Sequence, residues 1–302
     1  MGAIPSGRRR RIPETVYKEM FLMCVCRCLC LSAVLLGVTL LNGCASDPTP
    51  QDILSRIIFP NKWVGDIDQI GFNEPSGIVW HPLRKTLFVI GDEGDICEIA
   101  TDGTPVKQGH LRDADLEGIT CDPATGLLYV AVEEAETVLE VDPESFAILR
   151  EFSIPREFDG RTLLAAGGEG IEGITFVPDD THPQGGIFLV ANQAFTLTNE
   201  QDISAVFQVE LPLRDVASEP RILGWFSPGI IDLSALNYDA RTDRLLVVSD
   251  STNTLLVYSR NYELLEVYAF PGDNQEGVTV DPDGYIYIAQ DTGGIIKLKW
   301  LR

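Results

Sequence analysis

The segment Glu117-Gly118-Ile119-Thr120-Cys121-Asp122-Pro123 decides the fold, because related segments recur along the chain. Each is a short apolar run that opens with an acidic or small residue and leads into a polar turn. The five segments begin at Ser76, Glu117, Glu172, Ser234 and Glu276. After each turn comes a second run rich in β-branched and aromatic residues, such as residues 128–132. Neither run has a helical period, so the sequence predicts an all-β protein.

The spacing of the five segments indicates the architecture. Successive segments begin 41, 55, 62 and 42 residues apart. These are the lengths of four-stranded propeller blades with loop insertions, so we expect a single β-propeller of about five four-stranded blades. The last repeat stops at its third strand, residues 295–301. We therefore expect the segment 62–72, which precedes the first repeat, to add the missing outer strand and close the ring.

The first 44 residues differ in composition from the rest of the chain. Arginines 8–11 precede an apolar run, residues 29–41, which is typical of an export signal and short for a bilayer span. The run ends in Leu41-Asn42-Gly43-Cys44, which resembles the lipobox of bacterial lipoproteins, with Cys44 as the acylated residue. A plain anchor or a secretory signal cleaved nearby is the alternative. We expect a lipoprotein signal peptide at 1–44, a tether at 45–61 and the propeller domain at 62–302.

The net charge of the chain and its expected signal peptide indicate which partners and which location the protein has. The net charge is −22, and a surface this acidic repels nucleic acid and attracts cations. We expect an exported lipoprotein, anchored to a membrane through its lipid and facing the periplasm. Residues 45 and 46, Ala45 and Ser46, are not the aspartate that often retains lipoproteins in the inner membrane, which favours the outer membrane.

Cys97 and Cys121 fall within expected strands of different repeats, which favours buried free thiols over a disulfide.

Aligning the repeats produces two rings of polar residues. One ring opens the innermost strands: Ser76, Glu117, Glu172, Ser234 and Glu276. The other closes the second strands: Asp92, Glu133, Asn192, Asp250 and Asp291. In a propeller the loop that enters an innermost strand and the loop that leaves the second strand emerge on the same face. We therefore expect both rings to surround one mouth of the central channel.

Three glutamates at one mouth would raise each other's pKa unless a cation lies among them. Calcium suits such a site because it takes six to eight oxygen ligands and accepts carboxylates and amides together. We expect Glu117, Glu172 and Glu276 as ligands, with Asp250 and Asn192 as second choices. Ser76, Ser234, Asp92, Glu133 and Asp291 complete the channel-mouth ring. The alternative is that these acids only solvate the mouth and cap strand ends.

Taken in order, five phrases resemble the SdiA-regulated family of bacterial propellers over residues 71–300. They are EPSGIVW (74–80), DLEGIT (115–120), GIEGITF (170–176), DLSALNYDARTDRLLVVSD (232–250) and QEGVTVDPDGYIYIAQD (275–291). The resemblance implies a five-bladed propeller with a bound calcium ion and a role in protein–protein interaction, with no established enzyme activity. The chain departs from the family pattern at Ala235, where the family usually has glycine.

Three functions remain open at this point. The leading hypothesis is a membrane-tethered, calcium-binding propeller that is not an enzyme and presents its acidic face to a protein or a small-molecule ligand. The alternative is a metal-dependent lactonase or esterase in which a channel-mouth ion activates water, with Asp250 or Asp92 as the base. The third is an envelope scaffold in which calcium only joins the blades. The sequence contains no G-x-S-x-G elbow or P-loop, and no dinucleotide fingerprint in which a glycine-rich loop joins a strand to a helix, which argues against serine hydrolase and nucleotide chemistry.

Overall fold

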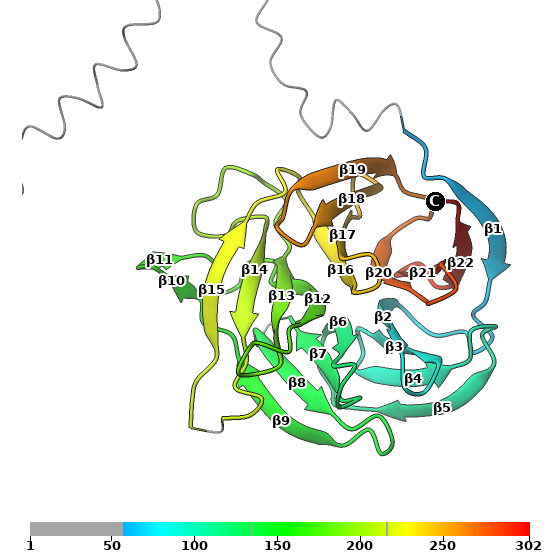
Figure 1. Ribbon diagram of the computed structural model, residues 1–302, viewed down its shortest axis with the longest axis horizontal. Helices are drawn as coiled ribbons and strands as arrows, with labels where there is room; N and C mark the ends of the chain where they lie inside the picture. The colour runs from blue at the N-terminus through cyan, green and yellow to red at the C-terminus, as the bar shows by residue number, and fades with distance from the viewer. Residues whose placement is uncertain (1–56, 134, 216) are drawn as a thin grey trace, which may run out of the picture. The chain divides into compact units, whose positions relative to one another are not determined.

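The computed structural model describes residues 57–133, 135–215 and 217–302, and it confirms an all-β propeller of five four-stranded antiparallel blades (Figure 1). The expected signal peptide 1–44, its Cys44 and most of the tether 45–61 lie outside the described residues. No helix occurs in the described part of the chain, and so none there is long and apolar enough to cross a bilayer.

The blades follow one another along the chain, and each runs from the channel outward. Blade 1 contains β2 (Pro75–His81), β3 (Thr86–Gly91), β4 (Asp95–Ile99) and β5 (Pro105–His110). Blade 2 contains β6 (Leu116–Cys121), β7 (Leu128–Val132), β8 (Thr137–Val141) and β9 (Ile148–Ser153). Blade 3 contains β12 (Ile171–Pro178), β13 (Gly186–Asn192), β14 (Ala205–Glu210) and β15 (Arg221–Phe226). Blade 4 contains β16 (Leu233–Asp239), β17 (Arg244–Ser249), β18 (Thr254–Ser259) and β19 (Leu264–Ala269).

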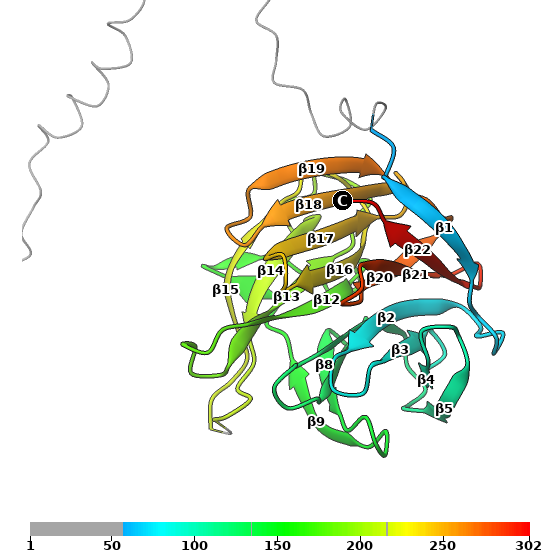
Figure 2. The same ribbon diagram turned by 45° about the vertical axis from the view of Figure 1, so that its right-hand side comes forward.

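Blade 5 closes the ring with a strand from the other end of the chain. Its strands β20 (Gln275–Val280), β21 (Tyr285–Gln290) and β22 (Ile295–Trp300) are completed by β1 (Asn61–Asp66), which pairs antiparallel with β22. Figures 1 and 2 show β1 along the outer edge of β22. This confirms the expected N-terminal closing strand, and it leaves no unpaired edge on β22.

An aromatic contact reinforces the closure. Phe59 is only 1% exposed, and its ring centroid lies 5.5 Å from that of Tyr268, 5.3 Å from Phe270 and 5.2 Å from Trp300. Tyr268 and Phe270 lie at the end of blade 4 and just after it, whereas Trp300 ends β22. The segment just before β1 therefore joins blades 4 and 5 through buried apolar surface.

The glycine of the repeated motif is explained by the spacing of the innermost strands. A Cβ atom on Gly118 would lie 2.4 Å from the backbone oxygen of Glu172, and one on Gly77 would lie 2.6 Å from that of Glu117. Neighbouring innermost strands can therefore approach this closely only because the residue at the point of contact is a glycine and has no side chain. The channel between them is reduced to a volume of about 10 Å³, room for a single water molecule at most.

The threonine of the motif links neighbouring blades. Thr120 Oγ1 accepts a hydrogen bond from the backbone N–H of Phe176 at 3.0 Å. Thr175 Oγ1 accepts from Tyr238 N at 2.8 Å, and Thr279 Oγ1 accepts from Trp80 N at 3.0 Å. Each bond satisfies a backbone donor that would otherwise be buried next to the channel.

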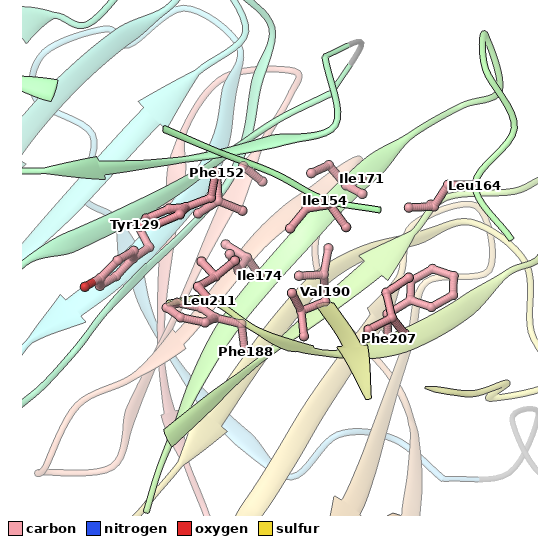
Figure 3. Close-up of a cluster of buried hydrophobic side chains, with 14 of the residues drawn as sticks. Tyr129, Phe152, Ile154, Leu164, Ile171, Ile174, Phe188, Val190, Phe207 and Leu211 are labelled. Carbon is pink, nitrogen blue, oxygen red and sulfur yellow. The ribbon is translucent and has the colours of Figure 1, made fainter. Parts of the chain in front are cut away.

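Apolar side chains fill the spaces between blades. Figure 3 shows the cluster between blades 2 and 3, where Tyr129 and Phe188 pack edge to face with ring centroids 4.8 Å apart. The short hairpin β10 (Glu157–Phe158) and β11 (Arg161–Thr162) connects these two blades, and Leu163 and Leu164 after it are buried in the same cluster. Cys97 and Cys121 are both buried and unpaired, as expected.

Candidate functional site at the acidic mouth of the channel

Strand register brings the two rings of polar residues to one mouth of the channel. Leu116 pairs with Val132, and the backbone N–H of Glu133 donates to the oxygen of Asp115, so the start of β6 with Glu117 and the end of β7 with Glu133 lie at the same end of the blade. In the same way Gln275 pairs with Gln290 and Asp291 N donates to the oxygen of Asn274, so Glu276 and Asp291 lie at this end of blade 5. We call this end of the channel the acidic mouth, and the residues around it are Ser76, Asp92, Asp115, Glu117, Glu133, Glu172, Ser234, Asp250, Glu276 and Asp291.

The third blade differs by one residue from the alignment made on the sequence. Ile171 pairs with Asn192, so the position equivalent to Glu133 and Asp291 is Gln193.

The Asn192 side chain is largely engaged by the protein. Asn192 is 0% exposed, and its Nδ2 donates to Asp202 Oδ1 at 3.1 Å and to the backbone oxygen of Ile203 at 2.9 Å. Its Oδ1 is buried and accepts no hydrogen bond. Only this oxygen is therefore available as a ligand.

Three carboxyl groups form the tightest group of potential ligands. Oxygen atoms of Asp92, Asp115 and Glu117 all lie within 4.8 Å of one another. Asp92 comes from the loop after β3, and the other two come from the start of β6 and the loop before it. Asp115 Oδ1 is buried and has no hydrogen-bond partner. Such an oxygen needs a proton or a cation nearby, since burying an unpaired acceptor is unfavourable.

The sequence reasoning missed Asp115. It lies two residues before Glu117, in the loop that leads into the motif, and the repeat offered one signal for it. The phrase Asp115-Leu116-Glu117 recurs in blade 4 as Asp232-Leu233-Ser234. In blade 4, however, the aspartate is engaged by the protein, because Asp232 accepts bonds from Gln193 Nε2 at 2.8 Å and from Ser251 N at 2.7 Å.

The half-buried Glu117 and the buried Glu172 form a pair of carboxyl groups in contact. Burial raises the pKa of both well above the ordinary value, and the hydrogen bond between them and the charges of neighbouring acids also act on this pair. Glu172 is only 5% exposed. Two buried carboxylates in contact cannot both be ionised without a counter-ion, so the pair holds a proton when no cation is bound.

Three further acids of the mouth, Glu276, Asp92 and Asp250, also have raised pKa values. Burial, followed by the charges of Asp250 and Asp232, raises the pKa of Glu276 to about 8, and Glu276 Oε2 is buried without a partner. Burial, followed by the charges of Asp115 and Asp291, raises the pKa of Asp92 to about 6. Burial also raises the pKa of Asp250, although its Oδ1 accepts a bond from Gln275 N at 2.8 Å.

No basic side chain neutralises these acids. Among the described residues, none of Asp92, Asp115, Glu117, Glu172 and Glu276 forms an ion pair with a lysine, arginine or histidine. The neighbouring charges that chiefly shift the pKa values of Asp92, Glu117, Glu172 and Glu276 all belong to other acids. The negative charge of these five acids is therefore not neutralised by an ion pair with a described basic side chain. A hard cation with oxygen ligands fits this donor set, which contains no histidine or cysteine.

The two serines of the ring hold neighbouring blades together. Ser234 Oγ donates to the backbone oxygen of Gln275 at 2.6 Å, and Ser76 Oγ donates to that of Leu116. In both cases the acceptor immediately precedes the ring glutamate of the next blade. The serines therefore position Glu276 and Glu117, and their hydroxyl hydrogens are used in doing so.

Comparison with known proteins agrees with this architecture. Among solved structures, the crystal structure of Myxococcus xanthus glutaminyl cyclase has a TM-score of 0.56 and 11% sequence identity, covering 80% of this chain and 97% of that one, a likeness that shows the fold alone. A chain of the mitotic checkpoint complex has a TM-score of 0.44 and 8% identity, covering 76% and 64%. No curated protein matches the sequence. The model of the SdiA-regulated family matches residues 64–292, which is most of the chain, and the protein therefore belongs to the SdiA-regulated family.

Proposed function

We propose that this protein is a calcium-binding propeller that acts as a non-enzymatic interaction module of the bacterial envelope. The observation that carries the proposal is the group of Asp92, Asp115 and Glu117, whose oxygens lie within 4.8 Å of one another while Asp115 Oδ1 is buried without a partner. Glu172 beside Glu117, and Glu276 of the neighbouring blade 5, add further oxygens to the same mouth. Coordination positions that the protein does not fill are open to water or to an oxygen of a bound partner.

The raised pKa values support a bound cation. Groups that resist ionisation when the site is empty become favourable ligands once a divalent charge is present, because the cation reverses the electrostatic penalty. Calcium fits better than magnesium, since it accepts irregular sets of carboxylate and amide oxygens whereas magnesium demands near-octahedral geometry.

Calorimetric titration of the chain without its first 44 residues tests the proposal. The wild type should bind calcium, and Asp115→Asn and Glu117→Gln should each weaken binding by at least about tenfold, which is about 1.4 kcal/mol. Glu93→Gln is the matched control, because Glu93 is an exposed acid beside Asp92 in the same loop. Absence of calcium binding by the wild type, or equal loss in the control, would reject the site.

The envelope part of the proposal rests on the sequence of the first 44 residues. The lipobox-like Leu41-Asn42-Gly43-Cys44 would attach the propeller to a membrane, with the outer membrane preferred. Metabolic labelling with a fatty acid, comparing the wild type with Cys44→Ala, tests the tether independently of calcium. Labelling that persists in Cys44→Ala would show that Cys44 is not the acylated residue.

The raised pKa values of two acids at the mouth also favour a second candidate function, that of a metal-dependent lactonase or esterase. Asp92 and Glu276 have pKa values of about 6 and about 8, which suits groups that exchange protons near neutral pH. Turnover of lactones or aryl esters that requires calcium and is lost in Glu276→Gln would favour this function over the interaction module. Turnover that is equal in the wild type and the variant would exclude it.

A further inference from the structure

The channel has a second mouth, where the five innermost strands end. A pocket of about 330 Å³ lies there, and it is lined by the last residues of all five strands and by the turns that follow them. Pro82, Pro123, Pro178 and Pro282 surround it, together with Trp80 and Phe176. We call this pocket the apolar bowl. Its volume is in the range of small-molecule sites, and proline rings make its walls stiff.

The polar groups of the bowl are mainly hydrogen-bond donors. Thr120 and Thr175 each accept a backbone N–H through Oγ1, and neither hydroxyl donates to any residue of the described chain. Asp239 also lines the bowl, but its carboxylate already accepts from Arg241 Nε at 3.1 Å and from Thr242 Oγ1 at 2.9 Å. The bowl therefore offers donors to a ligand, and its one carboxylate is already engaged.

Three cations and one further acid lie at one side of the bowl. Arg241 and Pro282 line both the bowl and an adjoining pocket of about 260 Å³, which also contains Lys299, Arg302 and Asp283. Arg241 is also ion-paired with Asp239 at 3.1 Å. The ammonium group of Lys299 donates to the backbone oxygen of Asp283 and lies 4.5 Å from the ring centroid of Tyr285. It forms no ion pair with an acid within residues 57–302 as the structure describes them. Its positive charge is therefore not neutralised by a direct carboxylate contact within the described residues.

We propose that the apolar bowl binds an amphiphilic anion, a small molecule whose aromatic or alkyl body fills the bowl and whose single acidic group lies between Arg241 and Lys299. Apolar surface supplies the affinity for the body, and the two cations select a ligand with a negative charge. The acidic mouth repels such a ligand, so the two mouths take ligands of opposite charge. The proposal does not depend on calcium binding.

The test uses two fluorescent probes with the same aromatic body. One is 8-anilinonaphthalene-1-sulfonate, and the other is N-phenyl-1-naphthylamine, which lacks the sulfonate. The sulfonate probe should bind the folded protein with a stoichiometry of one, equally well in calcium and in EDTA. Ala240→Trp, which adds bulk at an exposed residue lining the bowl, should weaken both probes at least about tenfold. Ala124→Trp is the matched control, since Ala124 is exposed in the corresponding turn of blade 2 and does not line the bowl.

Charge selection is tested with a second pair of variants. Lys299→Glu should weaken the sulfonate probe by about fivefold, as expected for a partly exposed charge pair, and should leave the neutral probe unchanged. Lys85→Glu makes the same charge change on the same face at an exposed residue outside both pockets and should have no effect. Failure of the wild type to bind either probe, or equal loss in Ala124→Trp and Ala240→Trp, would overturn the site. Equal effects of the two lysine variants would overturn the role of the acidic group.

Discussion

Replacing Gly118 by alanine should force two blades apart. The new methyl group would lie 2.4 Å from the backbone oxygen of Glu172 and 2.7 Å from the backbone nitrogen of Ile174. Both are backbone atoms of β12, so no side-chain rotation can relieve the contact. β6 and β12 must separate instead, and the bond between Thr120 and Phe176 joins the same two strands.

The size of the effect can be worked out from two opposing contributions. Overpacking a core by one methyl group costs about 1–3 kcal/mol, and a rigid backbone neighbour favours the upper part of this range. Alanine also restricts the unfolded chain, which stabilises the folded state by about 0.4–1 kcal/mol. We therefore expect a net loss of about 1–2 kcal/mol. In a domain of this size each kcal/mol lowers the midpoint of thermal unfolding by about 2–4 °C, so the midpoint should fall by about 2–8 °C.

Thermal unfolding followed by circular dichroism in EDTA measures this loss without a contribution from bound calcium. Gly65→Ala is the control, because a Cβ on Gly65 meets no atom within 4 Å. Its midpoint should stay at or slightly above that of the wild type. Calcium affinity should fall in Gly118→Ala as well, since Glu117 and Glu172 flank the contact. A wild-type midpoint for Gly118→Ala would refute the reasoning, because the glycine would then not be required by close approach of the strands.

Other predictions address the mouth and the ring closure. Because the pKa values of Asp92 and Glu276 rise from 3.8 and 4.5 to about 6 and about 8 on folding, the folded calcium-free protein binds more protons than the unfolded chain in that interval. Its stability should therefore fall as the pH rises from 5 to 8, as thermal unfolding in EDTA would show, and saturating calcium should reduce the loss. Phe59→Ala should lower the free energy of unfolding in urea by about 3–5 kcal/mol, whereas Ile58→Ala, at a residue 83% exposed, should not. Ser234→Ala removes a bond between blades and should cost about 1 kcal/mol in the same assay, and calcium affinity should also fall because this bond positions Glu276.

The five blades could be predicted from the sequence because the innermost strand of each blade has to pack closely against its neighbours, which places similar residues at similar positions. An innermost strand needs a residue without a side chain at its point of closest approach, as at Gly118, and a tight turn after the strand. The chain end supplied the other clue, since a last blade with three strands leaves an edge that β1 can pair with. Ala235 departs from the pattern, and its methyl group is buried in the cluster between blades 4 and 5.

The arrangement of the carboxyl groups could be predicted only in part. Repeats specify which residues reach the mouth, but side-chain convergence depends on strand register and on the β-bulges at the strand starts. Register shifts between Leu116 and Ile119, and between Ile171 and Ile174, next to the two paired glutamates. No sequence pattern shows that Asp115 joins Asp92 while Glu276 interacts most strongly with Asp250.

The two mouths are the opposite ends of the same five strands, and this separates their chemistry. In β6, Glu117 lies at the acidic mouth and Cys121 lines the apolar bowl, so at about 3.3 Å per residue the two ends are about 13 Å apart. This distance exceeds the screening length of about 8–10 Å at physiological ionic strength, and the channel between the mouths admits no more than a water molecule. Calcium at one mouth should therefore leave the affinity of the other for an amphiphilic anion unchanged. If the dissociation constants are instead coupled, the coupling passes through the protein between the mouths. It is then carried by the field of the bound ion, which electrolyte does not screen inside the protein, or by a change in the spacing of the innermost strands.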